Sequence, residues 1–484
     1  MIVLPDRAAL APAEQYALDL LVDLSRLVPV DHAEVDLVRL AVVEEQGGGG
    51  SVGALAAENW GVTHVDGVVR VPRRTLARIT EVVSGTRERR SAVRDRFGRV
   101  PSAENVLVTE GLERDPVVSR AALALRQAVF AAAAARPVRL VAPWPHGYRW
   151  AAAFTHDLDV VSLWPAFTLL RIGELLAKRE GRRALRAARA ATASIARAPV
   201  WDAAQALLAM ERRREVASTW FILCGTPTLR TIRAGDLTYR PESHGARRIL
   251  AAVASVGHEI GLHGSFETMD TPARFAPQRE RLIALTGAAV HGVRQHFLRI
   301  QPALSEHAMS SAGFTYDSTR GFADRNGFRS GVADIFPVWY NDAPGTGDFS
   351  EAPFCWMDRA LSKYQGTEEP AAWIADAIEL ANTCRDVEGL WTGIWHPNLS
   401  APLGYPGAPE AYAELLQAAI DGGAWVATLA RIVAWRTARR SVRIRNVTAD
   451  GRIEAFASAP DAMELVLEDA GGARREHVCA GVLP

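Results

Sequence analysis

Short β-like runs alternate with longer helical patterns between about residue 150 and residue 438, and this alternation constrains the fold more than any other feature. The runs include "WAAAFTHD", "HEIGLHGS" and "GLWTGIWHP", and helical patterns such as "ESHGARRILAAVASVG" lie between several of them. Repeated strand and helix units predict parallel strands with helical crossovers, as in an α/β barrel or a doubly wound sheet. In either architecture the chemistry collects where the strands end.

The regions on both sides of this alternation differ from it, and 484 residues exceed the size of one ordinary core. We expect a mixed α/β domain over residues 1–148, for which the sequence indicates no role, and a small β-rich tail over residues 441–484. The α/β domain between them spans residues 149–440 in this interpretation. Its first crossover is unusually long and holds a basic helical insertion at residues 171–215.

The insertion is strongly basic. Residues 171–197 hold eight Lys or Arg against two Glu, a charge of about +6. This segment is either a solvated helical face or a basic amphipathic hairpin that contacts an anionic membrane surface or a phosphate-bearing substrate. The sequence leaves both interpretations open, including peripheral membrane contact through residues 171–197.

Composition and targeting signals exclude several classes of protein. The formal net charge is zero and 23% of residues are charged, which is typical of a globular protein and gives no support to nucleic-acid binding. The N-terminus lacks the basic region and apolar run of a secretory signal, and the four cysteines are scattered without metal-type spacing. We therefore expect a cytoplasmic protein with buried thiols, and the sequence leaves association with a membrane surface open.

Two carboxylates end the first strand of the alternation, in "FTHDLD". Side chains at i and i+2 of a strand share a face, so Asp157 and Asp159 point the same way if the strand runs that far. Carboxylates this close repel each other unless a cation or a proton lies between them. A metal ion is therefore the first hypothesis for this strand end.

Polar residues also end three later strands, and a parallel sheet brings such ends to one rim. These residues are His263, with Glu267 four positions later, Arg294 and His296 on one strand face, and His396. Each residue alone is more simply a turn former or a cap. Together they predict one site.

The order of "FTHDLD", "EIGLHGSFE", "GVRQHFLR", "YDST" and "GIWHP" resembles the motif series of the NodB-homology polysaccharide deacetylases, the family 4 carbohydrate esterases. The resemblance covers residues 150 to 400. It implies a distorted (β/α) barrel, a divalent metal ion, most often zinc, and hydrolysis of N-acetyl groups from amino sugars. It also implies a setting in bacterial envelope polysaccharide assembly.

The resemblance assigns roles to individual residues. Asp157 matches the general base that activates water, and Asp159 and His263 match metal ligands. Arg294 matches the arginine that holds the base in place, and His396 the histidine that protonates the leaving amine. Hydrolysis of an amide needs an activated water, a polarised carbonyl and a proton for nitrogen, so this division of labour is chemically reasonable.

Two departures from the family pattern affect the metal site. The second motif usually has a histidine where this chain has Glu267, and the third usually has proline where this chain has His296. Zinc accepts carboxylate oxygen, so Glu267 is one candidate for the third ligand and His296 is another. In a third alternative only Asp159 and His263 remain, binding is weak and the domain has lost catalysis.

Three further residues are candidates for substrate contact. Aromatic faces stack on sugar rings but also fill cores, and Trp395 and Trp356 are the best-placed tryptophans for a substrate wall. Asp317, in "YDST", ends a strand near the rim, where it hydrogen-bonds the site or a sugar, or else forms a turn.

Three functions follow from these features. The first is a metal-dependent hydrolase that removes an N-acetyl or related N-acyl group from an amino sugar in a polysaccharide or its precursor. The second is an amidase or deformylase that acts on a small or lipid-linked substrate. The third is an inactive glycan-binding or scaffolding protein that keeps the fold.

Overall fold

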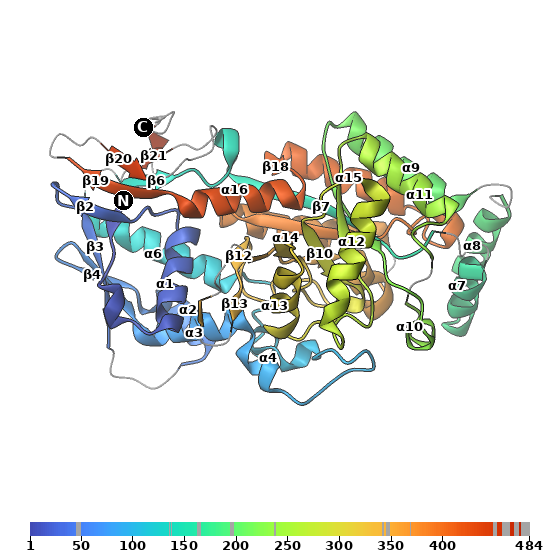
Figure 1. The fold of residues 1–484 in the computed structure, drawn as a ribbon, viewed down its shortest axis with the longest axis horizontal. Coiled ribbons are helices and arrows are strands. Elements are labelled where there is room, and N and C mark those ends of the chain that lie inside the picture. The colour runs from blue at the N-terminus through green and yellow to red at the C-terminus, as the bar shows by residue number, and fades with distance from the viewer. Residues whose placement is uncertain are drawn as a thin grey trace.

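The computed structural model shows a mixed α/β protein built around a ten-stranded sheet (Figure 1). The structure describes residues 1–484 except 45–49, 135, 137, 162–165, 194–197, 237–238, 341–342, 345–348, 368, 449–452, 457–464, 469–473 and 476–484. The strand order is β12-β15-β11-β10-β9-β8-β7-β17-β16, and β18 also pairs with β7. Every pairing in this sheet is parallel except that of β12 with β15, as the alternation of the sequence predicts.

The strands of this sheet are short apart from the central ones. Their bounds are β7 Trp150–Leu158, β8 Thr219–Leu223, β9 Glu259–Gly264, β10 Gly292–Gln295, β11 Tyr316–Asp317, β12 Phe336–Pro337, β15 Ser350–Glu351, β16 Trp356–Met357, β17 Leu390–Trp395 and β18 Ala424–Val426. All nine residues of β7 are buried. Burial on both faces is expected of a central parallel strand and explains its continuous run of apolar residues.

Helices lie between many of the strands along the chain. They are α7 Ala166–Ala177, α8 Gly181–Ala193, α9 Pro199–Arg213, α10 Leu229–Ala234, α11 His244–Ser255, α12 Phe275–Thr286, α13 Leu304–Ser311, the π-helix Ala360–Gln365, α14 Pro370–Asp386, α15 Ala408–Asp421 and α16 Leu429–Ser441. Local sequence signals set where several of these helices begin. For example, the Ser243 hydroxyl accepts a hydrogen bond from the Ala246 amide and so caps α11.

The sheet is an open, curled half-barrel rather than a closed (β/α) barrel. Among the described residues no pairing joins its edge strands, β12 and β16. Strands β17 and β10 are separated by β7, β8 and β9, which in a flat sheet is about 19 Å. Nevertheless, His396 and His296, which follow β17 and β10, both lie within 3.6 Å of the Asp159 carboxylate. The curl therefore brings distant strand ends to one site.

The N-terminal part packs its helices against a second, smaller sheet. This sheet has the order β1-β3-β5-β4, with bounds Ile2–Val3, Val38–Val43, Val68–Pro72 and Thr63–Val65. Its helices are α1 Pro12–Leu24, α2 Val52–Ala57, α3 Arg73–Ser84, α4 Thr86–Arg90, α5 Val106–Thr109 and α6 Val117–Ala133. Val332, Phe336 and Trp339 of the central region lie in the same apolar core. The two regions are therefore packed together.

The described strands of the tail join strands from the N-terminal part. β19 Arg443–Val447 pairs with β2 Val30–Ala33 and with β20 Ile453–Phe456. β21 Leu465–Glu468 pairs with β6 Val138–Val141 and with β22 Arg474–Arg475. A further short hairpin pairs β13 Trp339–Tyr340 with β14 Ala343–Pro344. The domain boundaries at residues 148 and 440 stay predictions.

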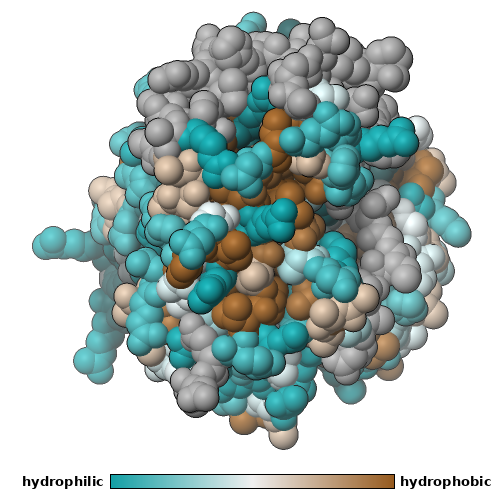
Figure 2. Space-filling model, turned by 90° about the vertical axis from the view of Figure 1, so that its left-hand side faces the viewer, coloured by the Kyte–Doolittle hydropathy of each residue, from teal (hydrophilic) through white to brown (hydrophobic). Residues whose placement is uncertain are grey.

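The cysteines and the apolar character of the helices bear on two expectations from the sequence. Cys224, Cys355 and Cys384 are free and buried, as predicted, whereas Cys479 lies outside the described residues. None of the helices in the described part of the chain has the length and apolar character needed to cross a bilayer. Figure 2 shows the face that looks left in Figure 1, where hydrophobic residues gather near the centre and polar residues surround them.

Candidate metal and catalytic site

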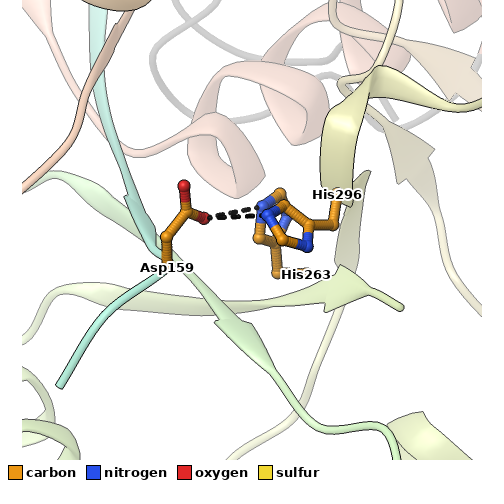
Figure 3. A group of neighbouring side chains, drawn as sticks. All are labelled: Asp159, His263 and His296. Carbon is orange, nitrogen blue, oxygen red and sulfur yellow. Dashed lines mark ion pairs between the residues drawn. The ribbon is translucent and has the colours of Figure 1, made fainter. Parts of the chain in front are cut away.

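Three side chains from different strand ends converge on one point (Figure 3). The His263 Nε2 atom lies 3.4 Å from Asp159 Oδ1, and the His296 Nε2 atom lies 3.6 Å from the same oxygen. Their potential ligand atoms all lie within 4.8 Å of one another. His263 is the last residue but one of β9, His296 follows β10, and Asp159 follows β7.

Hydrogen bonds behind the two imidazoles set which nitrogen faces the carboxylate. His263 Nδ1 donates to the Arg294 carbonyl oxygen at 2.8 Å, and His296 Nδ1 donates to the Asp236 carboxylate. Because each Nδ1 carries the proton, the Nε2 lone pair of a neutral ring points into the cluster. Such oriented imidazoles are characteristic of metal ligands.

The spacing of the three atoms suits a divalent ion. For tetrahedral zinc with bonds of about 2.1 Å, neighbouring ligand atoms lie about 3.4 Å apart. The distances from Asp159 Oδ1 to the two Nε2 atoms, 3.4 and 3.6 Å, match this value. Two imidazoles and one carboxylate also leave a coordination position open, as in catalytic zinc sites. The residues therefore fit a divalent metal ion.

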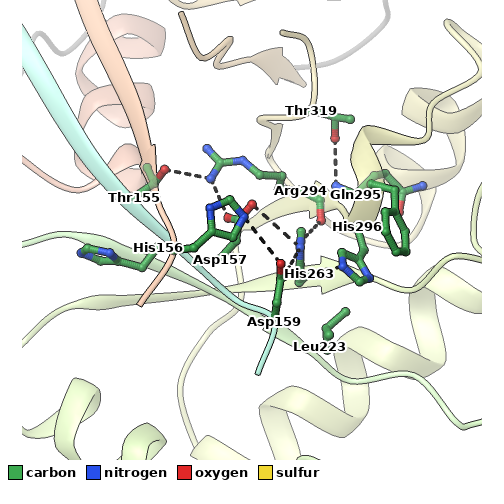
Figure 4. Close-up of polar contacts among 12 residues, drawn as sticks. Thr155, His156, Asp157, Asp159, Leu223, His263, Arg294, Gln295, His296 and Thr319 are labelled. Atoms are coloured by element: carbon green, nitrogen blue, oxygen red, sulfur yellow. Dashed lines mark hydrogen bonds and ion pairs between the residues drawn. The ribbon is translucent and has the colours of Figure 1, made fainter. Parts of the chain in front are cut away.

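A second carboxylate, Asp157, is held by a buried arginine beside this cluster (Figure 4). Arg294 Nη1 donates to Asp157 Oδ1 and to the Thr155 hydroxyl, both at 2.8 Å. Arg294 also donates to the backbone and the hydroxyl of Ser318, and it has no exposed surface. Burial alone raises the pKa of Asp157, but Arg294, His263 and His396 outweigh burial and hold the pKa below its usual value.

His396 approaches the cluster from β17 and has a carboxylate partner of its own. Asp358 Oδ1 accepts a hydrogen bond from His396 Nδ1 at 2.6 Å, and Asp358 Oδ2 accepts one from the His396 backbone amide at 2.7 Å. The His396 Nε2 atom lies 3.5 Å from Asp159 Oδ2. Burial alone lowers the pKa of His396, but Asp358 and then Asp159 raise it above its usual value. The ring is therefore suited to donate a proton near the cluster.

Glu267, the other candidate for the third ligand, is not part of the cluster. Its carboxylate accepts a hydrogen bond from the Thr228 hydroxyl at 2.8 Å and forms an ion pair with Arg274 at 2.6 Å. The turn after β9 therefore directs Glu267 toward these partners, while β10 delivers His296 to the cluster.

The structure places the candidate substrate residues away from the pocket. Trp395 and Trp356 are 2% and 1% exposed, and their rings stack on each other in the main core. Asp317 is also buried, and it pairs in register with Val293 rather than with Arg294. Neighbours in register share a face, so Asp317 points to the face opposite Arg294. There, burial and the nearby Glu306 raise its pKa to about 7.

The pocket around the cluster contains residues that the sequence analysis did not single out. They are Arg99, Gln295, Phe297, Leu298, Ala323, Met357, Arg359, Lys363 and Tyr364. Arg99 comes from the N-terminal part, pairs with Asp95, and donates to the Phe297 carbonyl at 2.9 Å. The sequence analysis also did not single out the carboxylates that hold His396 and His296. Asp358 follows a short strand as Asp159 does, and this position was the only sequence signal for it. Asp236 lies in a loop and had none.

Of the comparisons with known proteins, only the comparison with solved structures finds matches. Neither a family model nor a curated protein matches the sequence. A protein from Mycobacterium smegmatis described as a polysaccharide deacetylase is 24% identical, with a TM-score of 0.42 over 63% of this chain and 96% of that chain. A family 4 carbohydrate esterase from Streptomyces lividans is 9% identical, with a TM-score of 0.30 over 57% of this chain and 92% of that chain.

A pseudoenzyme of the CE4 family from Bacillus anthracis is also similar. It is 10% identical, with a TM-score of 0.29 over 58% of this chain and 65% of that chain.

Proposed function

We propose that this chain is a metal-dependent hydrolase that removes an N-acetyl or related N-acyl group from an amino sugar. One observation supports this proposal above all: the cluster of Asp159, His263 and His296 shares its pocket with an arginine-held carboxylate, Asp157, and a carboxylate-held histidine, His396. These are the groups that amide hydrolysis requires.

Each protein group has a step that its surroundings favour. A divalent ion held by the cluster would supply a Lewis acid that polarises the amide carbonyl and makes water more acidic. Asp157, ionised beside Arg294, accepts a proton from the attacking water. His396 donates a proton to nitrogen as the C–N bond breaks, and the products are a carboxylic acid and a free amine.

We propose zinc as the ion, because imidazole and carboxylate ligands at near-tetrahedral spacing suit it. The resemblance of the motifs supports an amino sugar of bacterial envelope polysaccharide, or its precursor, as the substrate. The cytoplasmic location stays a prediction from the sequence.

The test combines metal content with product release. Protein purified without chelators is assayed by plasma mass spectrometry for bound metal, and for acetate released from N-acetylglucosamine oligomers. We expect about one zinc per chain and acetate release that chelation abolishes. An N-formyl substrate tests the deformylase alternative. No metal after zinc addition, with glycan bound equally by wild type and Asp157→Asn and turned over by neither, would establish a glycan-binding or scaffolding role instead.

A further inference from the structure

The wall of the candidate active-site pocket carries cations that amide hydrolysis does not use. Arg359 lies between β16 and the π-helix Ala360–Gln365, next to Asp358, and Lys363 lies on that π-helix. Both line the same pocket as Asp159, His296 and His396. Arg99 lines it too, but its charge is balanced by Asp95.

Arg359 and Lys363 form no ion pair with any residue that the structure describes. Arg359 donates to the Tyr405 hydroxyl at 2.7 Å, and the Lys363 ammonium lies 5.8 Å from the centre of the Tyr364 ring. The nearest carboxylate in sequence, Asp358, is already bound through both oxygens by His396. The two cations are therefore available to a ligand.

The balance of charges in the pocket also indicates that Arg359 and Lys363 are available to an anionic ligand. Asp157 is balanced by Arg294, and a divalent ion would more than balance Asp159. With the ion bound, Arg359 and Lys363 make the pocket positive. A pocket lined by charges of one sign attracts a ligand of the opposite sign.

We propose that the substrate carries a phosphate next to the acylated sugar, and that Arg359 and Lys363 bind this phosphate. This inference rests on the proposed hydrolase function. An arginine fork and a lysine ammonium are the usual protein ligands of phosphate oxygens. A nucleotide-linked sugar and a lipid diphosphate-linked sugar both provide this chemistry.

The chain allows a direct test because it has only two lysines. Lys363 lies in the pocket, and Lys178 directly follows α7. Amines of the full chain are acetylated in the presence of inorganic phosphate, and the labelling of each lysine is measured by peptide mass spectrometry. Metal-bound and chelator-treated protein are labelled side by side, so that phosphate held by the metal ion alone is recognised. We expect phosphate to slow labelling of Lys363 by about tenfold and to leave Lys178 unchanged, and Arg359→Gln to lose the protection.

Other outcomes overturn the proposal. Equal protection of both lysines would indicate non-specific binding, and protection by glucuronate but not phosphate would indicate a carboxylate-bearing sugar. In turnover assays, Lys363→Gln should raise KM for N-acetylglucosamine 1-phosphate by about tenfold with little change in kcat, and should leave a neutral oligomer unaffected. Lys178→Gln is the matched control.

The kinetic and labelling readouts separate the two proposals. Protection of Lys363 without any turnover would retain the phosphate site and refute the hydrolase. Turnover of a neutral oligomer without protection would do the reverse. Comparing a soluble sugar nucleotide with a lipid diphosphate-linked sugar then identifies the source of the phosphate.

The hairpin formed by α7 and α8 protrudes at the right-hand end of Figure 1. The two helices pack through Leu175, Ala184 and Ala187. On α7, the exposed side chains are mainly apolar: Leu169, Leu170 and Leu176 are 65%, 73% and 58% exposed. Singly exposed leucines are common, but three on one helix of a protruding hairpin form an apolar face.

The outward face of α8 is basic. Arg182, Arg186 and Arg189 are exposed at helical spacing, with Leu185 between them. The acidic residues of the hairpin, Glu174 and Glu180, are paired with other arginines. The three α8 arginines form no ion pair with any described residue, so their charges face outward.

The root of the hairpin lies beside the candidate active-site pocket. The Thr168 hydroxyl donates to the Pro402 carbonyl at 3.0 Å, and the Arg171 guanidinium lies 4.7 Å from the centre of the Tyr405 ring. Tyr405 also accepts the hydrogen bond of Arg359. One aromatic residue thus connects the hairpin with the pocket wall.

We infer that the hairpin binds the surface of an anionic lipid bilayer. Exposed leucines insert at the headgroup boundary and arginines attract anionic lipids, which is how amphipathic basic helices bind membranes. A helix face that is apolar without the adjacent basic face would suit a protein partner equally well. The uncompensated arginines favour the bilayer.

Co-sedimentation of the full chain with vesicles tests this inference. We expect binding to phosphatidylcholine vesicles that contain phosphatidylglycerol, weaker binding in high salt, and little binding to phosphatidylcholine alone. Replacing Arg182, Arg186 and Arg189 by Glu should weaken binding by about a hundredfold or more. Leu169→Ser with Leu170→Ser should also weaken it, whereas Leu304→Ser, at a 53% exposed leucine on α13, should not.

Two results would overturn the membrane inference. One is equal binding of wild type and the arginine variant. The other is a self-associated wild type that the Leu169→Ser, Leu170→Ser variant makes monomeric in sedimentation velocity without a change in vesicle binding. Turnover of a soluble substrate should be unchanged in all of these variants, so the result is independent of the hydrolase proposal.

Discussion

Replacing Asp157 by Asn separates catalysis from metal binding. The substitution keeps the size of the side chain and an acceptor for Arg294, but it removes the proposed base. Loss of a positioned general base costs about 10² to 10⁴ in rate, which is about 3 to 5 kcal/mol in the activation barrier. Because Asp157 is outside the cluster of potential ligand atoms, we expect metal content to stay at the wild-type value.

Asp157→Asn should also lower the free energy of unfolding. Breaking a buried ion pair costs about 3 to 5 kcal/mol, and we expect the lower end, because Arg294 keeps its hydrogen bonds to Thr155 and Ser318. The folded pKa of Asp157 lies below its unfolded value of about 3.9, so its contribution is present above about pH 4 and is lost as pH falls through the folded pKa. The stability difference should therefore shrink in acid.

The assays are acetate release, metal analysis and urea unfolding at neutral and acidic pH. Arg294 has no exposed surface, so unfolding is measured on the same preparation as activity to show that the variant is folded. If Asp157→Asn retains wild-type turnover, the assignment of the base is wrong. If it loses metal as fully as a variant of a cluster residue does, Asp157 is a ligand and the reasoning from geometry fails.

Three further predictions follow from individual contacts. His263→Ala should lose the bound metal and Glu267→Ala should keep it, because only His263 lies in the cluster; plasma mass spectrometry measures both, and metal loss in Glu267→Ala would contradict the placement. Asp358→Asn should move the alkaline limb of the kcat/KM profile to lower pH. Protonated His396 is the active form and Asp358 raises its pKa, so activity is lost as pH rises through that pKa. An unchanged limb would exclude His396 as the acid. Glu388→Gln should lower the free energy of unfolding by about 3 kcal/mol or more, because three arginine side chains pair with this one buried carboxylate; a change within the range of a surface ion pair in urea unfolding would argue against it.

Much of the site was predictable because it depends on local periodicity. The period of two along a strand places Asp157 beside Thr155, on the face where Arg294 meets both. The carboxyl ends of parallel strands share an edge, so His263, Arg294 and His396 were expected near Asp157, and the structure brings them together.

Other features depended on contacts that no local pattern encodes. Trp395 precedes His396 in the chain, but successive strand residues point to opposite faces, so the tryptophan enters the core. Glu267 lies beyond the strand, where the course of the turn brings it to Arg274. Lys363 and Arg99 reach the pocket from a π-helix and from the N-terminal part, neither of which the strand pattern describes.

The parallel α/β architecture and the residues at its strand ends are predictable from the sequence, because alternation and periodicity are properties of neighbouring residues. Long-range packing places His296 rather than Glu267 beside Asp159 and His263. It also brings Asp236 and Asp358 to the imidazoles of His296 and His396, which they orient. These outcomes depend on how far the sheet curls and on where the loops turn. Both are set by packing between segments that are distant in the chain.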